Sequence, residues 1–155
     1  MVKLIGKNKL NVAIFISGRG SNLKSLIDFA KKNTSPIKIM LVVSNNLKAN
    51  GLNYAKNNNI KSIVVKYKDR LKAEKEILYA VNKNSIKLIC LAGFMKILSK
   101  KFIKNFKGKI LNIHPSLLPK YKGLDAHSKV IENKEKFSGC TVHLVNSRLD
   151  SGKII

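Results

Sequence analysis

Apolar runs of strand length alternate with amphipathic segments along most of the chain. Asn11–Ile16 and Lys87–Ala92 are almost unbroken apolar runs, as is typical of parallel strands that are buried on both faces. Ser21–Lys32 instead carries its apolar residues at helical spacing. This alternation predicts an α/β fold, an open doubly wound and mostly parallel sheet with helices on both faces.

The same reading places eleven elements along the chain. The expected strands are Asn11–Ile16, Ile37–Val43, Ser62–Val65, Lys87–Ala92, Lys109–Ile113 and Cys140–Val145. The expected helices are Ser21–Lys32, Asn50–Asn58, Arg70–Asn82, Ser99–Asn105 and Ala126–Asn133. His143 alternates with apolar neighbours, which predicts that the last strand lies in a more exposed and antiparallel position. Lys153–Ile155 look like the first steps of a further strand.

The length of 155 residues suits a single domain, residues 1–155, with a full hydrophobic core. Cys90 and Cys140 lie inside apolar runs without metal-ligand spacing, so we expect two buried free thiols and no metal site. Met1–Lys7 is basic but lacks an apolar core of signal-peptide length, and no later run approaches a membrane span. These features predict a soluble, cytoplasmic protein.

The formal net charge of +23 is extreme for a chain of this size and raises the possibility of a nucleic-acid partner. The positive residues are nearly all lysines that are spread along the chain, with arginine only at Arg19, Arg70 and Arg148. Aromatic residues do not interleave with them as a stacking platform would require. We therefore interpret the charge as a solvated surface that could still attract small anions.

Asn112 and His114 stand two residues apart at the end of an expected strand, so their side chains share one face. Pro115 then stops the strand and holds His114 at its carboxyl end, where open α/β sheets bind ligands. An amide can hold a developing oxyanion while an imidazole exchanges a proton, and this pairing suits acyl transfer. The alternative is a histidine that only ends a strand and bonds to a loop.

Two further segments follow strands at the same edge of the expected sheet. Ser17–Asn22, with the glycines of a Gly-x-Gly turn, predicts a phosphate cradle at a helix start. The alternatives are that the glycines only allow a tight turn and that Ser21 only caps the helix. Ala92–Ser99 is unusually apolar for a loop. It could form the wall of a pocket for a flat ring, or Phe94, Met95 and Ile97 could close the core.

These segments, together with Gly139–His143 and Leu149–Gly152, resemble the phosphoribosylglycinamide formyltransferases, a family of folate-dependent enzymes of purine synthesis. The resemblance covers nearly the whole chain with the motifs in order. It implies a Rossmann-like formyltransferase fold that lacks the family's last strand and C-terminal helix, so that the domain would be incomplete at its C-terminus. It also implies transfer of a formyl group from 10-formyltetrahydrofolate, a co-substrate, to the amine of 5'-phosphoribosylglycinamide, without a metal.

The resemblance assigns site residues by position. Catalysis falls to Asn112, His114 and Asp150, where Asp150 would hold the imidazole protonated and steer a proton-relaying water. The substrate phosphate falls to Gly20, Ser21 and Asn22. The formyl folate falls to Arg70, Met95, Lys96, Ile97, Leu98 and Asn112, with Lys96 replacing the arginine of many relatives. His127 and His143 are expected to be supporting or structural residues, and Asp150 could alternatively serve only in a turn.

Other interpretations remain open at this point. Methionyl-tRNA formyltransferase and formyltetrahydrofolate hydrolase share the Asn-x-His and Asp pattern, but the loop Gly18–Asn22 suits a phosphoribosyl group better. A basic nucleic-acid-binding α/β protein and an inactive, truncated folate-binding remnant are the alternatives of a different class. We expect small-molecule partners, no membrane contact, and a monomer or homodimer.

Overall fold

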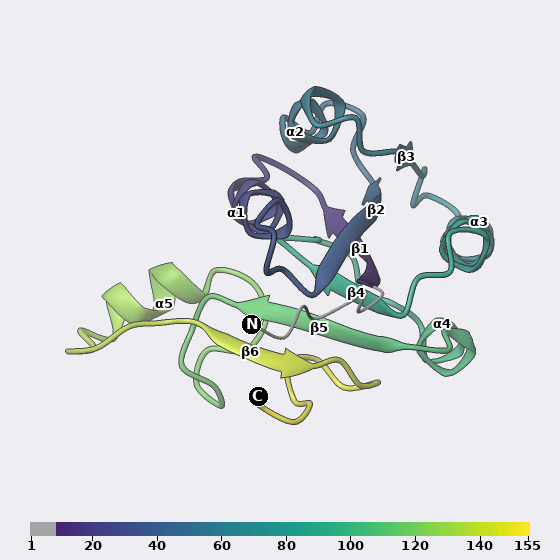
Figure 1. The fold of residues 1–155 in the computed structure, drawn as a ribbon. Helices are drawn as coiled ribbons and strands as arrows, with labels where there is room; N and C mark the ends of the chain where they lie inside the picture. The colour runs from purple at the N-terminus through teal and green to yellow at the C-terminus, as the bar shows by residue number, and fades with distance from the viewer. Residues whose placement is uncertain (1–8) are drawn as a thin grey trace.

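A computed structural model describes residues 9–155, which form six strands and five helices (Figure 1). The strands are β1 (Leu10–Ile16), β2 (Ile37–Ser44), β3 (Ser62–Val64), β4 (Leu88–Leu91), β5 (Lys109–His114) and β6 (Thr141–Leu144). The helices are α1 (Ser21–Ala30), α2 (Gly51–Asn57), α3 (Arg70–Lys83), α4 (Lys100–Asn105) and α5 (Ala126–Glu132). Each expected element is present, with ends that differ by one or two residues from the prediction.

The strands form one sheet in the order β3-β2-β1-β4-β5-β6. Neighbouring strands from β3 to β5 run parallel, whereas β6 runs antiparallel to β5. The predicted doubly wound, mostly parallel sheet is therefore confirmed, as is the antiparallel direction of β6. After β3 the chain crosses back over the sheet to form β4 on the other side of β1. The strand order therefore reverses at the boundary between the neighbouring strands β1 and β4, and open α/β sheets bind ligands beside such a reversal.

Helices cover both faces of the sheet (Figure 1). Leu23 and Ile27 of α1 pack with alternate residues of β1, such as Ile14, in one core cluster. Ile77 of α3 and Phe102 of α4 pack on the opposite face with the other set of β1 residues. Because β1 is buried on both faces, its sequence reads as an unbroken apolar run.

One expectation about β6 is wrong. His143 was expected to mark an exposed strand, yet it is only 2% exposed, while the apolar Val142 faces outward. The inward direction of His143 follows from its pairing with Asn112 of β5. His143 therefore points into a polar cluster rather than into solvent.

The cysteine prediction is also wrong in part. Both thiols are free, but Cys140 is exposed and Cys90 is partly buried. Cys140 precedes β6 in a segment that projects beyond the sheet together with α5 (Figure 1), so its apolar neighbours in sequence do not cover it. Burial raises the pKa of the Cys90 thiol to about 11, which keeps this thiol protonated near neutral pH.

Ile154 forms an isolated antiparallel bridge with His143, and the Leu144 amide donates to the Lys153 carbonyl at 2.8 Å. The expected start of a further strand is thus seen as a single bridge beside β6. The interpretation of Met1–Lys7 lies outside the described residues. Within residues 9–155, no helix combines the length and the apolar character of a membrane span.

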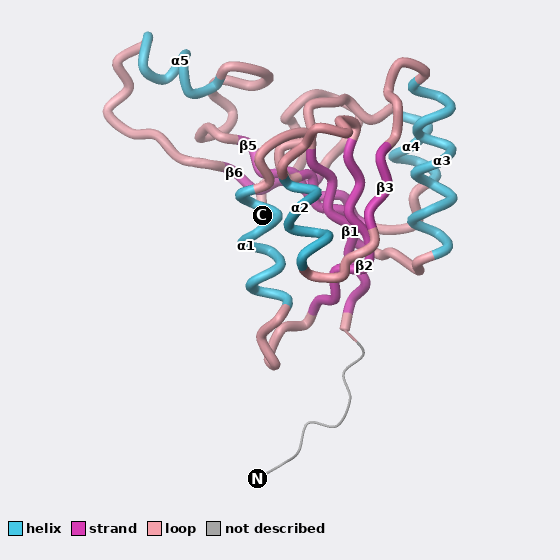
Figure 2. Tube along the Cα trace, turned by 90° about the horizontal axis from the view of Figure 1, so that it is seen from above, coloured by secondary structure: helices cyan, strands magenta, loops and turns pink. Residues whose placement is uncertain are grey.

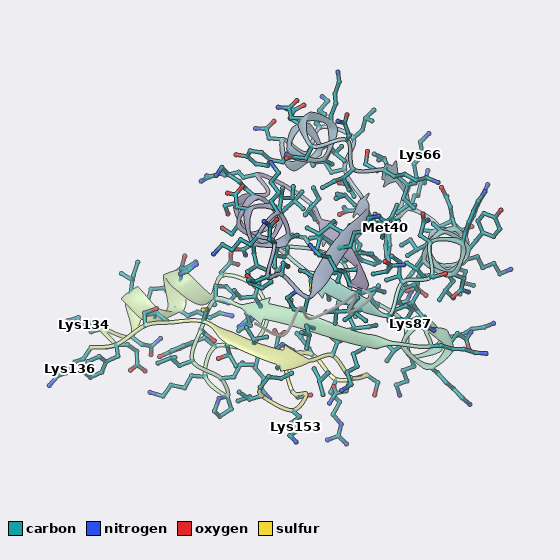
Figure 3. The ribbon with its side chains drawn as sticks, in the orientation of Figure 1. Met40, Lys66, Lys87, Lys134, Lys136 and Lys153 are labelled. Carbon is teal, nitrogen blue, oxygen red and sulfur yellow. The ribbon has the colours of Figure 1, made fainter. Side chains whose placement is uncertain are left out.

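The lysines are distributed over the molecule rather than gathered on one face. Figure 3 places Lys66 and Lys87 on one side, Lys134 and Lys136 at the far end near α5, and Lys153 below β6. All five are exposed. The scatter of these five lysines over different sides of the molecule agrees with a solvated basic surface.

Candidate active site

The loops that follow the parallel strands gather at one edge of the sheet, seen at the top of Figure 2. Ser17–Gly20 follows β1, Gly93–Ser99 follows β4, and β5 itself ends at His114. The carboxyl ends of parallel strands meet at the same edge, which is why segments far apart in sequence become neighbours here. All three predicted site segments therefore lie at this edge.

The first loop borders a hollow of about 240 Å³ lined by Ser17–Asn22, Ala92, Gly93 and Met95. Gly20 precedes α1 with a φ of 79°, so Gly20 takes the capping position expected for Ser21, and Ser21 is the first helical residue. Ser21 and Asn22 are exposed at this helix start. The helix amides and these two side chains are the donors that a phosphate group would require.

Gly20 also allows the close approach of α2. A Cβ built on Gly20 would lie 2.5 Å from Gly51 Cα, whereas one on Gly18 would meet nothing within 4 Å. We expect Gly20→Ala to lower the thermal midpoint and weaken phosphate-substrate binding, because left-handed backbone costs a non-glycine residue about 1–2 kcal/mol before this clash is added. Thermal unfolding and ligand titration would test this. Gly18→Ala is the matched control and should keep the midpoint; equal midpoints for both variants would contradict the prediction.

Ser17 connects this loop to its neighbours, a role that the sequence reading missed. Its Oγ donates to Asn45 Oδ1 and accepts from the Met95 amide at 2.7 Å. Its own amide donates to the Gly93 carbonyl at 3.1 Å. Ser17 thus joins the loops after β1, β2 and β4, and only its place at a strand end could have indicated this.

The loop after β4 divides into buried and exposed parts. Phe94 and Leu98 are 9% and 6% exposed and belong to the core, whereas Met95 and Ile97 are 63% and 65% exposed. The alternative that this loop only closes the core therefore holds for Phe94 but not for Met95 and Ile97. Arg70, the first residue of α3, is exposed.

Asn112, His114 and Asp150 come together in one buried cluster at the end of β5. Asn112 Nδ2 donates to Asp150 Oδ1 at 3.3 Å, and His114 Nδ1 lies 3.3 Å from Asp150 Oδ2. His114 is 4% exposed and Asp150 is 8% exposed. A carboxylate in so little water needs hydrogen-bonded partners, and the amide and the imidazole supply them.

The partners of His114 favour an imidazolium. Its Nε2 lies 2.8 Å from the Tyr121 carbonyl oxygen, which can only accept, so this nitrogen carries a proton. Its Nδ1 faces the Asp150 carboxylate, and a proton there turns two opposed lone pairs into a charged hydrogen bond. A doubly protonated ring beside a carboxylate is therefore the form that satisfies every polar contact of His114.

His143 is a direct neighbour of this cluster. Its Nδ1 lies 2.9 Å from the Leu144 carbonyl and therefore carries a proton, and its Nε2, 3.2 Å from Asn112 Nδ2 and 3.5 Å from Asp150 Oδ1, can accept from the Asn112 amide. Asn112 Nδ2 therefore has acceptors on both sides, which fixes its amide orientation. This arrangement agrees with a supporting role for His143. His127, on α5, is exposed.

Two backbone groups complete the cluster, and no residue type marks either of them in the sequence. The Gly123 amide donates to Asp150 Oδ2 at 2.9 Å, and the Tyr121 carbonyl accepts from His114. Tyr121 and Asp150 both have a positive φ, 54° and 41°. Such backbone is uncommon for residues other than glycine and is found preferentially at functional sites.

The described residues contain no group of three or more His, Cys, Asp or Glu side chains arranged to hold a metal ion. The chemistry of the cluster rests on an amide, an imidazolium and a carboxylate. These groups can stabilise a developing oxyanion and exchange a proton.

The fold and this cluster together define an open α/β protein with an amide, an imidazole and a carboxylate gathered at the carboxyl edge of its parallel strands. The model of the formyl transferase family matches residues 10–155, and the chain belongs to this family. The family predicted from the sequence is thus confirmed.

Individual relatives agree. The trifunctional purine biosynthetic protein adenosine-3 of Gallus gallus is 47% identical over 154 residues, which are 97% of this chain and 15% of that protein. The phosphoribosylglycinamide formyltransferase of Haemophilus influenzae is 43% identical and is matched over 93% of this chain and 69% of its own length. The crystal structure of phosphoribosylglycinamide formyltransferase from Anaplasma phagocytophilum superposes with a TM-score of 0.89 at 43% identity, covering 96% of this chain and 70% of that one.

Proposed function

We propose that this chain transfers the formyl group of 10-formyltetrahydrofolate to the amine of 5'-phosphoribosylglycinamide. The observation that supports this most is the cluster of Asn112, His114 and Asp150 at the same edge of the sheet as a hollow lined by Ser17–Asn22. The names of relatives at 38% to 47% identity point the same way. Family membership does not favour the alternative of a basic nucleic-acid-binding protein.

In this proposal the phosphate of the glycinamide substrate binds at Gly20, Ser21 and Asn22. The formyl folate lies against the exposed side of the loop after β4, with Arg70 at the start of α3 available to its acidic groups. The residues assigned to it are Arg70, Met95, Lys96, Ile97, Leu98 and Asn112. Lys96 and Arg70 are exposed cations that suit an anionic ligand.

The amine nitrogen would attack the formyl carbon and form a C–N bond, which places negative charge on the formyl oxygen. Asn112 Nδ2 and the protonated His114 would stabilise this charge. Collapse of the intermediate would break the bond between the formyl carbon and folate N10. The proton lost by the amine would pass through water, oriented by Asp150, to N10, which leaves as part of tetrahydrofolate.

The Tyr121 carbonyl occupies His114 Nε2. A formyl oxygen that bonds to this nitrogen therefore has to replace this carbonyl, so we expect the segment 120–125 to shift when both substrates bind. All three catalytic candidates come from one chain, which is compatible with a monomer or a homodimer. The proposed reaction would take place in the cytoplasm.

The test is an absorbance assay of formyl transfer from 10-formyltetrahydrofolate to 5'-phosphoribosylglycinamide. We expect turnover that depends on both substrates and that fails when glycinamide without the phosphoribosyl group is supplied. Absence of transfer together with salt-sensitive binding to nucleic acid would support the nucleic-acid-binding alternative. Folate binding without transfer would support an inactive folate-binding remnant.

A further inference from the structure

Glu74 on α3 is a buried carboxylate that the proposed reaction does not use. It is only 4% exposed, although charged side chains are almost never fully buried unless they are paired. It belongs to none of the segments that carry the family resemblance. Its position inside a lysine-rich protein is also unusual, because its partners are neutral groups rather than lysines.

Three donors satisfy this carboxylate. Glu74 Oε1 accepts from the Ser99 amide at 2.7 Å and from the Tyr67 hydroxyl at 3.3 Å, and Oε2 accepts from Ser99 Oγ. Ser99 Oγ in turn accepts from the Phe102 amide at 3.0 Å and so caps α4. One side chain of α3 thus fixes both the main chain and the side chain at the end of the loop after β4.

The loop after β4 is held at its other end by Ser17. The Ser17 amide donates to the Gly93 carbonyl, and Ser17 Oγ accepts from the Met95 amide. Between the two attachments, Met95, Lys96 and Ile97 are exposed. The exposed part of the loop is therefore short, and its position depends on both ends being held.

Aromatic packing holds the loop after β4 at Phe94, next to the Ser17 attachment. The Tyr67 ring meets Phe94 edge-on at 5.8 Å, and Phe94 meets Phe15 of β1 at 5.3 Å. Burial and the neighbouring Glu74 carboxylate raise the pKa of the Tyr67 phenol, which therefore stays a hydrogen-bond donor throughout the neutral range. The Glu74 contacts thus join α3, this aromatic stack and the loop.

We infer that Glu74 is a positioning residue for the co-substrate: it sets the loop that carries Met95, Lys96 and Ile97 relative to Arg70. Arg70 lies one helical turn before Glu74 on α3, so a helix that is attached to the loop also places this cation. The inference rests on the proposed function. It makes α3 and the loop one wall of the formyl-folate pocket, although Gly93 and Met95 of the same loop also line the phosphate hollow.

A carboxylate is required at this position for a chemical reason. The two oxygens of Glu74 accept from the Ser99 amide, the Ser99 hydroxyl and the Tyr67 hydroxyl. Glutamine has only one oxygen, and its NH₂ group would face the amide or the hydroxyl of Ser99, which are donors here. The isosteric Glu74→Gln therefore disturbs the loop attachment with little change in packing. Glu74→Asp keeps both acceptors on a side chain that is one methylene shorter, and should show an intermediate effect.

The experiment compares Glu74→Gln, Glu74→Asp and the control Glu76→Gln, an exposed glutamate on the same helix. We expect Glu74→Gln to raise the KM for 10-formyltetrahydrofolate roughly tenfold, the scale of one lost charge-assisted hydrogen bond. The KM for 5'-phosphoribosylglycinamide should change much less, to within about twofold, because the phosphate loop is also held by Asn45 and Gly51, which do not belong to the loop after β4. Glu76→Gln should leave both values unchanged.

Direct binding of tetrahydrofolate, followed by calorimetry alongside thermal unfolding, separates this inference from the proposed reaction. Weaker tetrahydrofolate binding by Glu74→Gln supports the inference even if the wild-type chain transfers no formyl group. Equal changes in both KM values, or a lower thermal midpoint with unchanged tetrahydrofolate binding, would show a purely structural carboxylate. A wild-type chain that does not bind tetrahydrofolate would also overturn the inference. If Glu74→Gln does not fold, Tyr67→Phe removes only one of the three donors and should raise the same KM to a smaller extent.

Discussion

His114→Ala is expected to lower kcat for formyl transfer by a factor between about 10² and 10⁴, the usual contribution of a positioned acid or base. His114 lies between the Asp150 carboxylate and the Tyr121 carbonyl, two acceptors that favour a proton on each ring nitrogen. Alanine removes this charge from the place where the oxyanion would form. Steady-state kinetics with both substrates would measure the loss, and the KM values should change much less than kcat.

The same substitution has a cost for folding, which has to be measured separately. Asp150 and the Tyr121 carbonyl would each lose a hydrogen-bond partner, and the Asp150 carboxylate is only 8% exposed to solvent. An unsatisfied buried group costs about 1–3 kcal/mol. Activity is therefore compared at a temperature where thermal unfolding shows both proteins to be folded. Full activity of folded His114→Ala would exclude His114 from the mechanism.

The strands and their order of appearance were predictable because burial determines the pattern of apolar residues. β1 and β4 read as apolar runs since both their faces are covered, and helices α1 and α3 show helical spacing since one face of each packs on the sheet. Asn112 and His114 were predictable as neighbours for a related reason, because residues two apart on a strand share a face. Their contact with Asp150 was expected only through the family resemblance.

Other parts of the site could not be read from the sequence. The Tyr121 carbonyl and the Gly123 amide contribute backbone atoms, which every residue has, so no residue type marks their roles. Glu74 lies among charged residues of α3 and resembles a solvated position until the loop after β4 is seen against it. His143 was misjudged because alternation identifies the two faces of a strand but not which of them meets a polar cluster.

Asn112→Ala is expected to reduce kcat roughly a hundredfold or more, because removal of one oxyanion donor typically costs about 3 kcal/mol of transition-state stabilisation. Asn112 Nδ2 uses its two hydrogens for Asp150 Oδ1 and His143 Nε2, so the oxyanion has to replace one of these acceptors when it forms. Alanine loses this donor and leaves the ground-state pockets in place. The expected signature is an equal fall in kcat and kcat/KM, since the interaction is made chiefly in the transition state.

Asn84→Ala is a matched control for this substitution. Asn84 ends α3, and its Nδ2 donates to the Ala80 carbonyl at 2.7 Å, so the variant also deletes a hydrogen-bonded amide but at a helix terminus. It should lower the thermal midpoint slightly and keep kcat. Because Asn112 also touches the carboxylate that pairs with His114, the double variant Asn112→Ala, His114→Ala should lose less than the product of the two single losses. Strict multiplication of the two effects would mean that the amide and the imidazole act independently, which the shared Asp150 carboxylate argues against.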